Sequence, residues 1–145
     1  MAIQRMHHVG VVVDDLEGAV EFFAALGLEA GGKSEVTEEW AGRVVGLDDM
    51  RVDAVMVEAP DGKGRLELIK FHSPPIAGDE APLPANVRGI RHLAFVVDDV
   101  RAAVAEVEAH GGELVGEIVD YSNVYRLCYV RGPEGIIVEL AQELS

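Results

Sequence analysis

Two histidines and two glutamates occupy matching places in the chain and could together hold a metal ion. His8 and His92 each open an apolar segment, while Glu67 and Glu139 each lie inside an apolar segment shortly after a Pro-x-Gly turn. A carboxylate in an apolar strand is costly unless it is paired or coordinated. If the two halves of the chain bring these side chains together, two imidazole nitrogens and two carboxylate oxygens suit a divalent ion such as Ni, Co, Mn, Fe or Zn, with positions left for water or substrate.

Each of these residues has a plainer interpretation when it is taken alone. A single histidine at a strand start is more often a hydrogen-bonded core residue than a ligand, and a single strand glutamate usually faces solvent. The duplicate positions favour the metal interpretation. His7 has no counterpart in the second half and alternates to the opposite face of its strand, so a structural role is expected for it. His72 and His110 fall at linker or helix-end positions, where solvated side chains are expected.

A sequence repeat accounts for the matching places of the two histidines. Residues 8–15, His-Val-Gly-Val-Val-Val-Asp-Asp, return 84 positions later as residues 92–99, His-Leu-Ala-Phe-Val-Val-Asp-Asp. At the same spacing Gly27 corresponds to Gly111. The match spans a strand, a helix and the glycine that ends the helix, and it predicts two duplicated modules.

Each module is predicted to contain a strand, a helix and then two or three further strands. The apolar run is typical of a buried strand, and the two aspartates after it are expected to provide a helix N-cap and a first-turn acid. Apolar residues then fall at i, i+3, i+4 and i+7, on one face of a helix. Later strands are expected at 52–58, 66–71, 114–119, 126–130 and 136–140, and residues 38–45 fit either a short helix or a lid loop.

The composition excludes several classes of partner. The 145 residues carry 12 Lys and Arg against 26 Asp and Glu, a formal net charge of −14, to which residues 1–72 and 73–145 each contribute −7. Such an acidic surface repels nucleic acid and anionic membranes. No apolar run approaches the roughly 18–20 residues that span a bilayer, and no signal peptide is recognised, so a cytoplasmic protein is expected. Cys128 is the only cysteine, which excludes an intrachain disulfide, and it is expected to pack inertly in a strand.

Three motifs make the chain similar to the vicinal oxygen chelate superfamily, which includes glyoxalase I, methylmalonyl-CoA epimerase, extradiol dioxygenases, fosfomycin resistance enzymes and bleomycin-binding proteins. They are His-Val-Gly-Val-Val-Val-Asp-Asp-Leu at 8–16, Phe-Phe-Ala-Ala-Leu-Gly-Leu at 22–28 and Gly-Pro-Glu-Gly-Ile-Ile-Val-Glu-Leu at 132–140. The resemblance implies a single α+β domain, 1–145, of two βαβββ modules whose curled mixed sheets surround a metal-binding cleft. The modules would cover about 1–72 and about 89–145, joined by a linker at about 73–88.

The resemblance also implies roles for individual residues. The metal ligands of the family correspond to His8, Glu67, His92 and Glu139. Glutamate at the second of these positions is usual in glyoxalases, whereas methylmalonyl-CoA epimerases usually carry glutamine there. The arginine that glutathione-using glyoxalases tend to carry shortly after the first ligand is missing from residues 9–13. Dimers are usual in the family, with modules that pair within one chain or are exchanged between chains, so a homodimer is expected.

The expected function is that of a metal-dependent lyase or isomerase of the glyoxalase or epimerase type. The ion would coordinate neighbouring oxygens of a small substrate and stabilise an enolate or enediolate, while Glu139 or Glu67 moves a proton on the adjacent carbon. Glu38 and Glu39 are weaker candidates for this base, with a solvated face as the alternative. Large or cationic side chains of the irregular segments are expected to contact the substrate, with ordinary packing as the alternative: Trp40, Arg43, Tyr121, Tyr125 and Arg126.

Two other functions stay open at this point. One is a non-catalytic protein that sequesters a natural product or antibiotic, in which an acidic cleft holds a cationic or metal-chelating drug. The other is a small one-domain dioxygenase, in which His8, His92 and Glu139 would provide the two histidines and one carboxylate that bind Fe(II).

Overall fold

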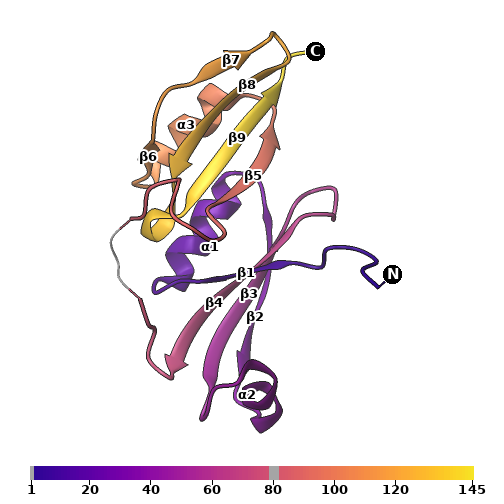
Figure 1. Cartoon of the computed structure of the whole chain (residues 1–145), viewed down its shortest axis with the longest axis vertical. Coiled ribbons are helices and arrows are strands. Elements are labelled where there is room, and N and C mark those ends of the chain that lie inside the picture. Colours follow the sequence, from indigo (N-terminus) through magenta and orange to yellow (C-terminus); the bar gives the residue numbers. More distant parts are fainter. Residues whose placement is uncertain (1, 79–81) are drawn as a thin grey trace. The chain divides into compact units, whose positions relative to one another are not determined.

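The chain divides into two compact units, Met1–Gly78 (unit 1) and Asp79–Ser145 (unit 2). The computed structural model describes residues 2–78 and 82–145, so residues 79–81 of the expected linker lie outside the described residues. Each unit contains one mixed sheet, and the described residues form three α-helices, which confirms the α+β class (Figure 1). None of the helices in these ranges is long and apolar enough to cross a membrane.

Unit 1 is a four-stranded sheet with a helix on each face. The strand order is β1-β4-β3-β2, with β1 parallel to β4 and the other neighbours antiparallel. α1 packs on the face where Phe23 and Leu68 are fully buried, and α2 lies at the end of the sheet where β3 begins (Figure 1). Ala41 of α2 forms a small core with Met50 and Val52 on the other face. The elements are β1 (Val9–Val12), α1 (Leu16–Ala25), β2 (Glu29–Val36), α2 (Glu39–Val45), β3 (Arg51–Glu58) and β4 (Arg65–Ser73).

Unit 2 repeats the parallel pairing of its first and last strands. The strand order is β5-β9-β8-β6, β7 also pairs with β8, and β5 is parallel to β9. α3 contacts the sheet on the face where Val130 and Leu140 are fully buried. Cys128 is buried on that face too, and burial raises the pKa of its thiol, as suits an inert packing residue. The elements are β5 (His92–Val97), α3 (Val100–Ala109), β6 (Glu113–Leu114), β7 (Val119–Tyr121), β8 (Tyr125–Arg131), a 3-10 turn (Pro133–Gly135) and β9 (Ile137–Glu143).

The predicted helix starts and ends are confirmed in both repeats. The side chains of Asp15 and Asp99 accept hydrogen bonds from backbone N–H groups of the first turns of α1 and α3. Gly27 and Gly111 follow the helices with φ angles of +112° and +85°, which glycine adopts without strain. The expected first-turn acid is wrong, because the second aspartate of each pair is itself the cap. Asp14 instead forms an ion pair with a lysine of β4.

Three segments differ from the sequence prediction or decide between its alternatives. β2 carries no sequence signal, because its residues are almost all exposed and include two adjacent glycines. The single strand expected at 114–119 is divided into β6 and β7, since residues 115–118 form a bend between the two pairings with β8. Of the alternatives at 38–45, the structure shows a helix, α2, which ends at Gly46 in the left-handed conformation.

Candidate functional site

Each unit brings one histidine and one glutamate together at the same place in its sheet. In unit 1, His8 immediately precedes β1, and its Nε2 lies 3.8 Å from Oε1 of Glu67 on β4. In unit 2, His92 is the first residue of β5, and its Nε2 lies 3.3 Å from Oε1 of Glu139 on β9. We refer to these as the unit 1 pair and the unit 2 pair.

The parallel register of the strands explains why both pairs form. Gly10 is the strand partner of Glu67, and Ala94 is the partner of Glu139. A histidine two residues before Gly10 or Ala94 therefore lies beside the glutamate on the same face. Because neither partner has more than a methyl side chain, nothing bulky separates the imidazole from the carboxylate.

The glutamates lie on the partly exposed face of strands whose other face is buried. The side chain of Glu67 is 34% exposed and that of Glu139 is 22% exposed. Next to Glu67 along β4, Leu66 and Leu68 point the other way and are 4% and 0% exposed. Partial exposure lowers the desolvation free energy that these carboxylates cost the folded protein. It also keeps them within reach of a small molecule. The histidines provide the partners that carboxylates in apolar strands are expected to need.

The donor atoms of the unit 2 pair are spaced as two ligands of one ion would be, and those of the unit 1 pair lie slightly farther apart. Ligands about 2.1 Å from a metal lie roughly 3.0 Å apart at a right angle and roughly 3.4 Å apart at the tetrahedral angle. The distance in the unit 2 pair fits this range, and the unit 1 pair needs a small closure. In the ranges that the structure describes, no group of three or more His, Cys, Asp or Glu side chains could hold an ion. Each pair contains two of the four ligands that the sequence predicts.

Each imidazole also has a neighbour at its second ring nitrogen. Nδ1 of His8 lies 2.6 Å from Nδ1 of His7, and Nδ1 of His92 lies 3.5 Å from the hydroxyl of Tyr129. The expectation that His7 points away from His8 is wrong, because the residues before β1 do not form a strand. The positive charge of Arg65 is the main cause of the lowered pKa of His7, and a neutral ring has a lone pair to accept an N–H.

Tyr129 is a candidate site residue that the sequence analysis does not identify. Its ring packs against His92 with 4.9 Å between the centroids. A signal does exist, because β8 and β9 form a hairpin around the turn at Pro133–Gly135, and counting outward from the turn places Tyr129 opposite Glu139. In unit 1 the residue opposite Glu67 on β3 is Met56. The two pairs thus have different neighbours.

Three of the residues expected to bind substrate lie on β7 and β8. Tyr121 and Tyr125 are cross-strand partners, and alternation along the strands puts them on the face of Glu139. Arg126 lies on the opposite face and donates two hydrogen bonds to Asp120, at 2.8 and 3.2 Å. This contact lowers the pKa of Asp120 and raises that of Arg126. The structure does not bring Arg126 to the unit 2 pair.

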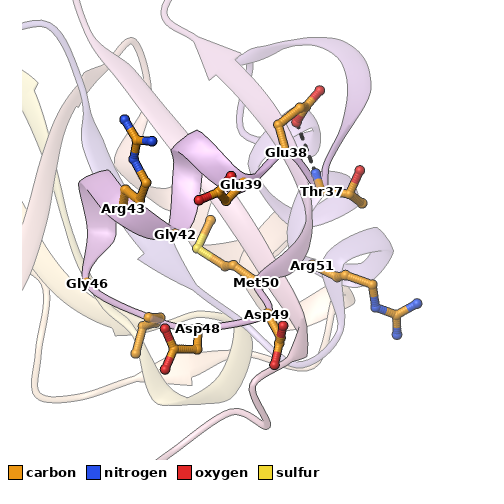
Figure 2. Close-up of a pocket in the computed structure, with 11 residues that line it drawn as sticks. Thr37, Glu38, Glu39, Gly42, Arg43, Gly46, Asp48, Asp49, Met50 and Arg51 are labelled. Atoms are coloured by element: carbon orange, nitrogen blue, oxygen red, sulfur yellow. Dashed lines mark hydrogen bonds between the residues drawn. The ribbon is translucent and has the colours of Figure 1, made fainter.

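The other two expected substrate residues lie on α2, beside a pocket of about 830 Å³ (Figure 2). Arg43 lines this pocket together with Glu38 and Glu39, the weaker base candidates, whereas Trp40 is not among its lining residues and is 58% exposed. Figure 2 shows the side chain of Met50 between α2 and the segment that leads into β3. Neither His–Glu pair contributes to the lining.

His72 lies on β4 rather than in the linker, which corrects its expected position, although its side chain is exposed as expected. Its Nε2 is 2.8 Å from Oδ2 of Asp53, and Lys33 Nζ lies 3.8 Å from the same oxygen. The hydrogen bond with His72 is the main cause of the lowered pKa of Asp53. These residues form a charge cluster that ties β2, β3 and β4 together.

Comparisons with known proteins cover nearly the whole chain. The family model of the Glyoxalase/Bleomycin resistance protein/Dioxygenase superfamily matches residues 5–140. A glyoxalase family protein from Bacillus cereus, known as a crystal structure, is 44% identical, with a TM-score of 0.96 over 100% of this chain and 99% of that chain. This likeness confirms the glyoxalase-like fold. The uncharacterized Escherichia coli protein YaeR is 28% identical over 99% of both chains. An ethylmalonyl-CoA/methylmalonyl-CoA epimerase from Cereibacter sphaeroides is 27% identical over 97% of this chain and 98% of that protein.

Proposed function

The chain belongs to the glyoxalase/bleomycin resistance protein/dioxygenase superfamily, and on this premise we propose that it is a metal-dependent lyase or isomerase for a small substrate with neighbouring oxygens. This superfamily includes metal-dependent isomerases and lyases. The observation that supports the proposal is the recurrence of a His–Glu pair at the same register position in both units. Unrelated surface pairs would have no reason to share that position.

All four side chains of the two pairs, His8, Glu67, His92 and Glu139, are proposed ligands of one divalent ion. Equal numbers of imidazole nitrogens and carboxylate oxygens suit Ni, Co, Zn, Mn or Fe, and the spacing within each pair is compatible with these ions. When bound, the ion would supply Lewis-acid polarisation of the substrate oxygens.

A carboxylate, Glu139 or Glu67, is the proposed base. A base must reach hydrogen-bond distance from the proton that it removes. Both carboxylates are partly exposed, and the small partners Gly10 and Ala94 leave their faces of the sheets accessible. The carboxylate would take the proton from the carbon next to the carbonyl group and later return it to the substrate, so no external acid is needed.

His7 and Tyr129 are the proposed positioning residues. Each contacts Nδ1 of its histidine, while Nε2 faces the glutamate. A partner that accepts the Nδ1 proton fixes the tautomer in which Nε2 has its lone pair free to bind a cation. Such partners also hold the orientation of the ring.

The metal content of the purified protein tests the proposal. The parent protein is expected to hold a stoichiometric divalent ion, and the Glu67→Ala and His92→Ala variants are expected to lose it while their circular dichroism is unchanged. Glu29→Ala, which changes an exposed acid of the same sheet, is the matched control and should keep the ion. A parent protein that folds but never takes up a divalent ion contradicts the proposal and favours the non-catalytic binding proteins.

Proton exchange in D2O tests the reaction class. Metal-loaded protein is expected to introduce deuterium at the carbon next to a carbonyl in its substrate, and methylmalonyl-CoA is a first compound to try because a relative is named for it. Exchange should disappear in both Glu67→Ala and Glu139→Ala.

We also propose that the protein is a homodimer. Dimers are frequent in the superfamily, and the edge strands β1 and β5 carry exposed valines at equivalent repeat positions, Val12 and Val96. Exposed apolar residues on an open strand edge favour association. Light scattering should give about twice the 15.6 kDa mass of one chain, and a monomeric mass contradicts this expectation.

A further inference from the structure

Unit 2 has an apolar pocket that the proposed function leaves without a role. Its volume is about 460 Å³, and it lies where the chain between β6 and β7 departs from β8. The N–H of Val115 donates to the carbonyl of Tyr129, and strand pairing resumes at Val119 opposite Leu127. Five residues, 115–119, therefore run beside three residues, 127–129. The extra length is accommodated in the bend that lines the pocket.

The pocket shares its face of the sheet with the unit 2 pair. Cross-strand partners point to the same side, and residues two apart in a strand do so as well. Tyr129 is the partner of Glu139, so it lies on the Glu139 face. Leu127, two residues earlier, and its partner Val119 lie on that face too. All three line the pocket.

Tyr129 connects the pocket to the candidate ligands. Tyr129 lines the pocket, and its ring packs against His92 with 4.9 Å between the two centroids. The apolar space therefore begins one side chain away from the unit 2 pair. A molecule with its oxygens beside His92 and Glu139 can reach it by extending past Tyr129.

The lining is mostly apolar although much of it is open to solvent. Val115, Val119 and Tyr121 are 44%, 55% and 64% exposed. Grouped apolar side chains at open positions indicate a binding surface, and the volume lies in the range of small-molecule sites. Glu117 and Asp120 also line this pocket, whereas six charged residues line the pocket beside α2 in unit 1, among them Asp48 and Asp49.

We propose that the unit 2 pocket binds an apolar group of the substrate, an aryl ring or a branched alkyl chain, while the substrate's neighbouring oxygens lie at the unit 2 pair. This inference rests on the proposed function and narrows its substrate class to oxygen-bearing compounds with one apolar substituent. Val119, Tyr121 and Leu127 then determine specificity.

Hydroxamates provide suitable probes, because they bind metals through two neighbouring oxygens and accept different substituents. Acetohydroxamate is compared by titration calorimetry with three phenyl hydroxamates, in which the ring is attached directly or through one or two methylenes, on protein loaded with Ni²⁺ or Zn²⁺. We expect at least one phenyl compound to bind about tenfold or more tightly than acetohydroxamate, since an apolar group of this size gains at least that much in an apolar pocket.

Two valines of the same hairpin give a matched pair of variants. Val119→Asp puts a charge into the pocket and should abolish the preference for the ring. Val124→Asp changes a valine that is 40% exposed but does not line the pocket, and it should keep the preference. Val119→Thr, which keeps the side-chain shape, serves if the charged variant fails to fold, and it should reduce the preference.

The outcomes separate the two proposals. Equal affinity for all four hydroxamates overturns the apolar subsite and leaves the metal proposal intact, and so does a ring preference that survives in Val119→Asp. If no hydroxamate binds to metal-loaded protein, the proposed function fails and the subsite fails with it. Nuclear Overhauser contacts between the bound ring and the methyls of Leu127 are expected, and contacts only to methyls elsewhere contradict the placement.

Discussion

Replacing Glu139 by alanine distinguishes a metal ligand from an ordinary strand acid. In metal-free protein the change removes a partly exposed pair, in which the glutamate is 22% and the histidine 37% exposed. Exposed pairs of this kind contribute about 1 kcal/mol or less to stability. The metal-free variant should therefore unfold within roughly 4 °C of the parent protein.

The difference becomes larger when metal is present. A ligand that binds only the folded protein at 100 times its Kd stabilises it by about 2.7 kcal/mol, which is roughly 8–11 °C for a chain of this length. Loss of a direct ligand should weaken metal binding at least about 100-fold, the upper value for residues that merely support ligands. At the same metal concentration the stabilisation then falls to about 0.4 kcal/mol.

Thermal unfolding with added Ni²⁺ or Zn²⁺, and again with EDTA, measures the rise in unfolding temperature that bound metal causes. Glu143→Ala is the matched control, because Glu143 lies on the same strand and the same face, four residues along, and is exposed. Glu143→Ala should keep the whole metal-dependent rise in unfolding temperature. The reasoning is refuted if Glu139→Ala also keeps it, or if Glu143→Ala loses it to the same degree.

Three further changes test the contacts around the site and in the core. Tyr129→Phe keeps the ring but removes the hydroxyl, and it should weaken metal binding about tenfold in a metal titration, whereas Tyr121→Phe should not. The pKa of Asp53 is lowered in the folded protein, so its contribution to stability is present above its ordinary value of 3.8 and is lost as pH falls through the lower folded pKa. Urea unfolding between pH 2 and 6 should show this loss as a fall in the free energy of unfolding. In Asp53→Asn the fall should be smaller, because the residue that contacts His72 no longer titrates. A variant with the same pH dependence as the parent protein contradicts this role of Asp53. Leu68→Ala opens a cavity at a residue with no exposure and should cost about 2–5 kcal/mol in urea unfolding, so a cost below 1 kcal/mol would place Leu68 outside the core.

The four candidate ligands could be predicted from the sequence because duplication repeats them in a fixed context. His8 and His92 stand at the same place before the same aspartate caps, and the caps and the helix-ending glycines are local features that the structure confirms. Local chemistry of this kind depends on neighbours along the chain, so it can be predicted without knowing the tertiary arrangement.

The remaining features depend on contacts that are distant in sequence or on irregular backbone. Tyr129 reaches His92 only through the pairing of β8 with β9 and of β9 with β5. His7 turns toward His8 because no strand holds it in alternation. β2 lies at a sheet edge with nearly all of its residues exposed, so selection for an apolar pattern is weak there. The apolar pocket likewise arises from a difference in length between paired segments, which no single segment encodes.

The unequal neighbours of the two glutamates have a consequence for the proton transfer. Duplicated carboxylates in identical surroundings would be equivalent as bases, and neither would be preferred for the proton transfer. Tyr129 stands opposite Glu139 where Met56 stands opposite Glu67, so the two carboxylates differ in polarity and in ring contact. Under the proposed function, this difference makes the two carboxylates inequivalent as bases, and exchange of these two residues should alter which of them removes the proton.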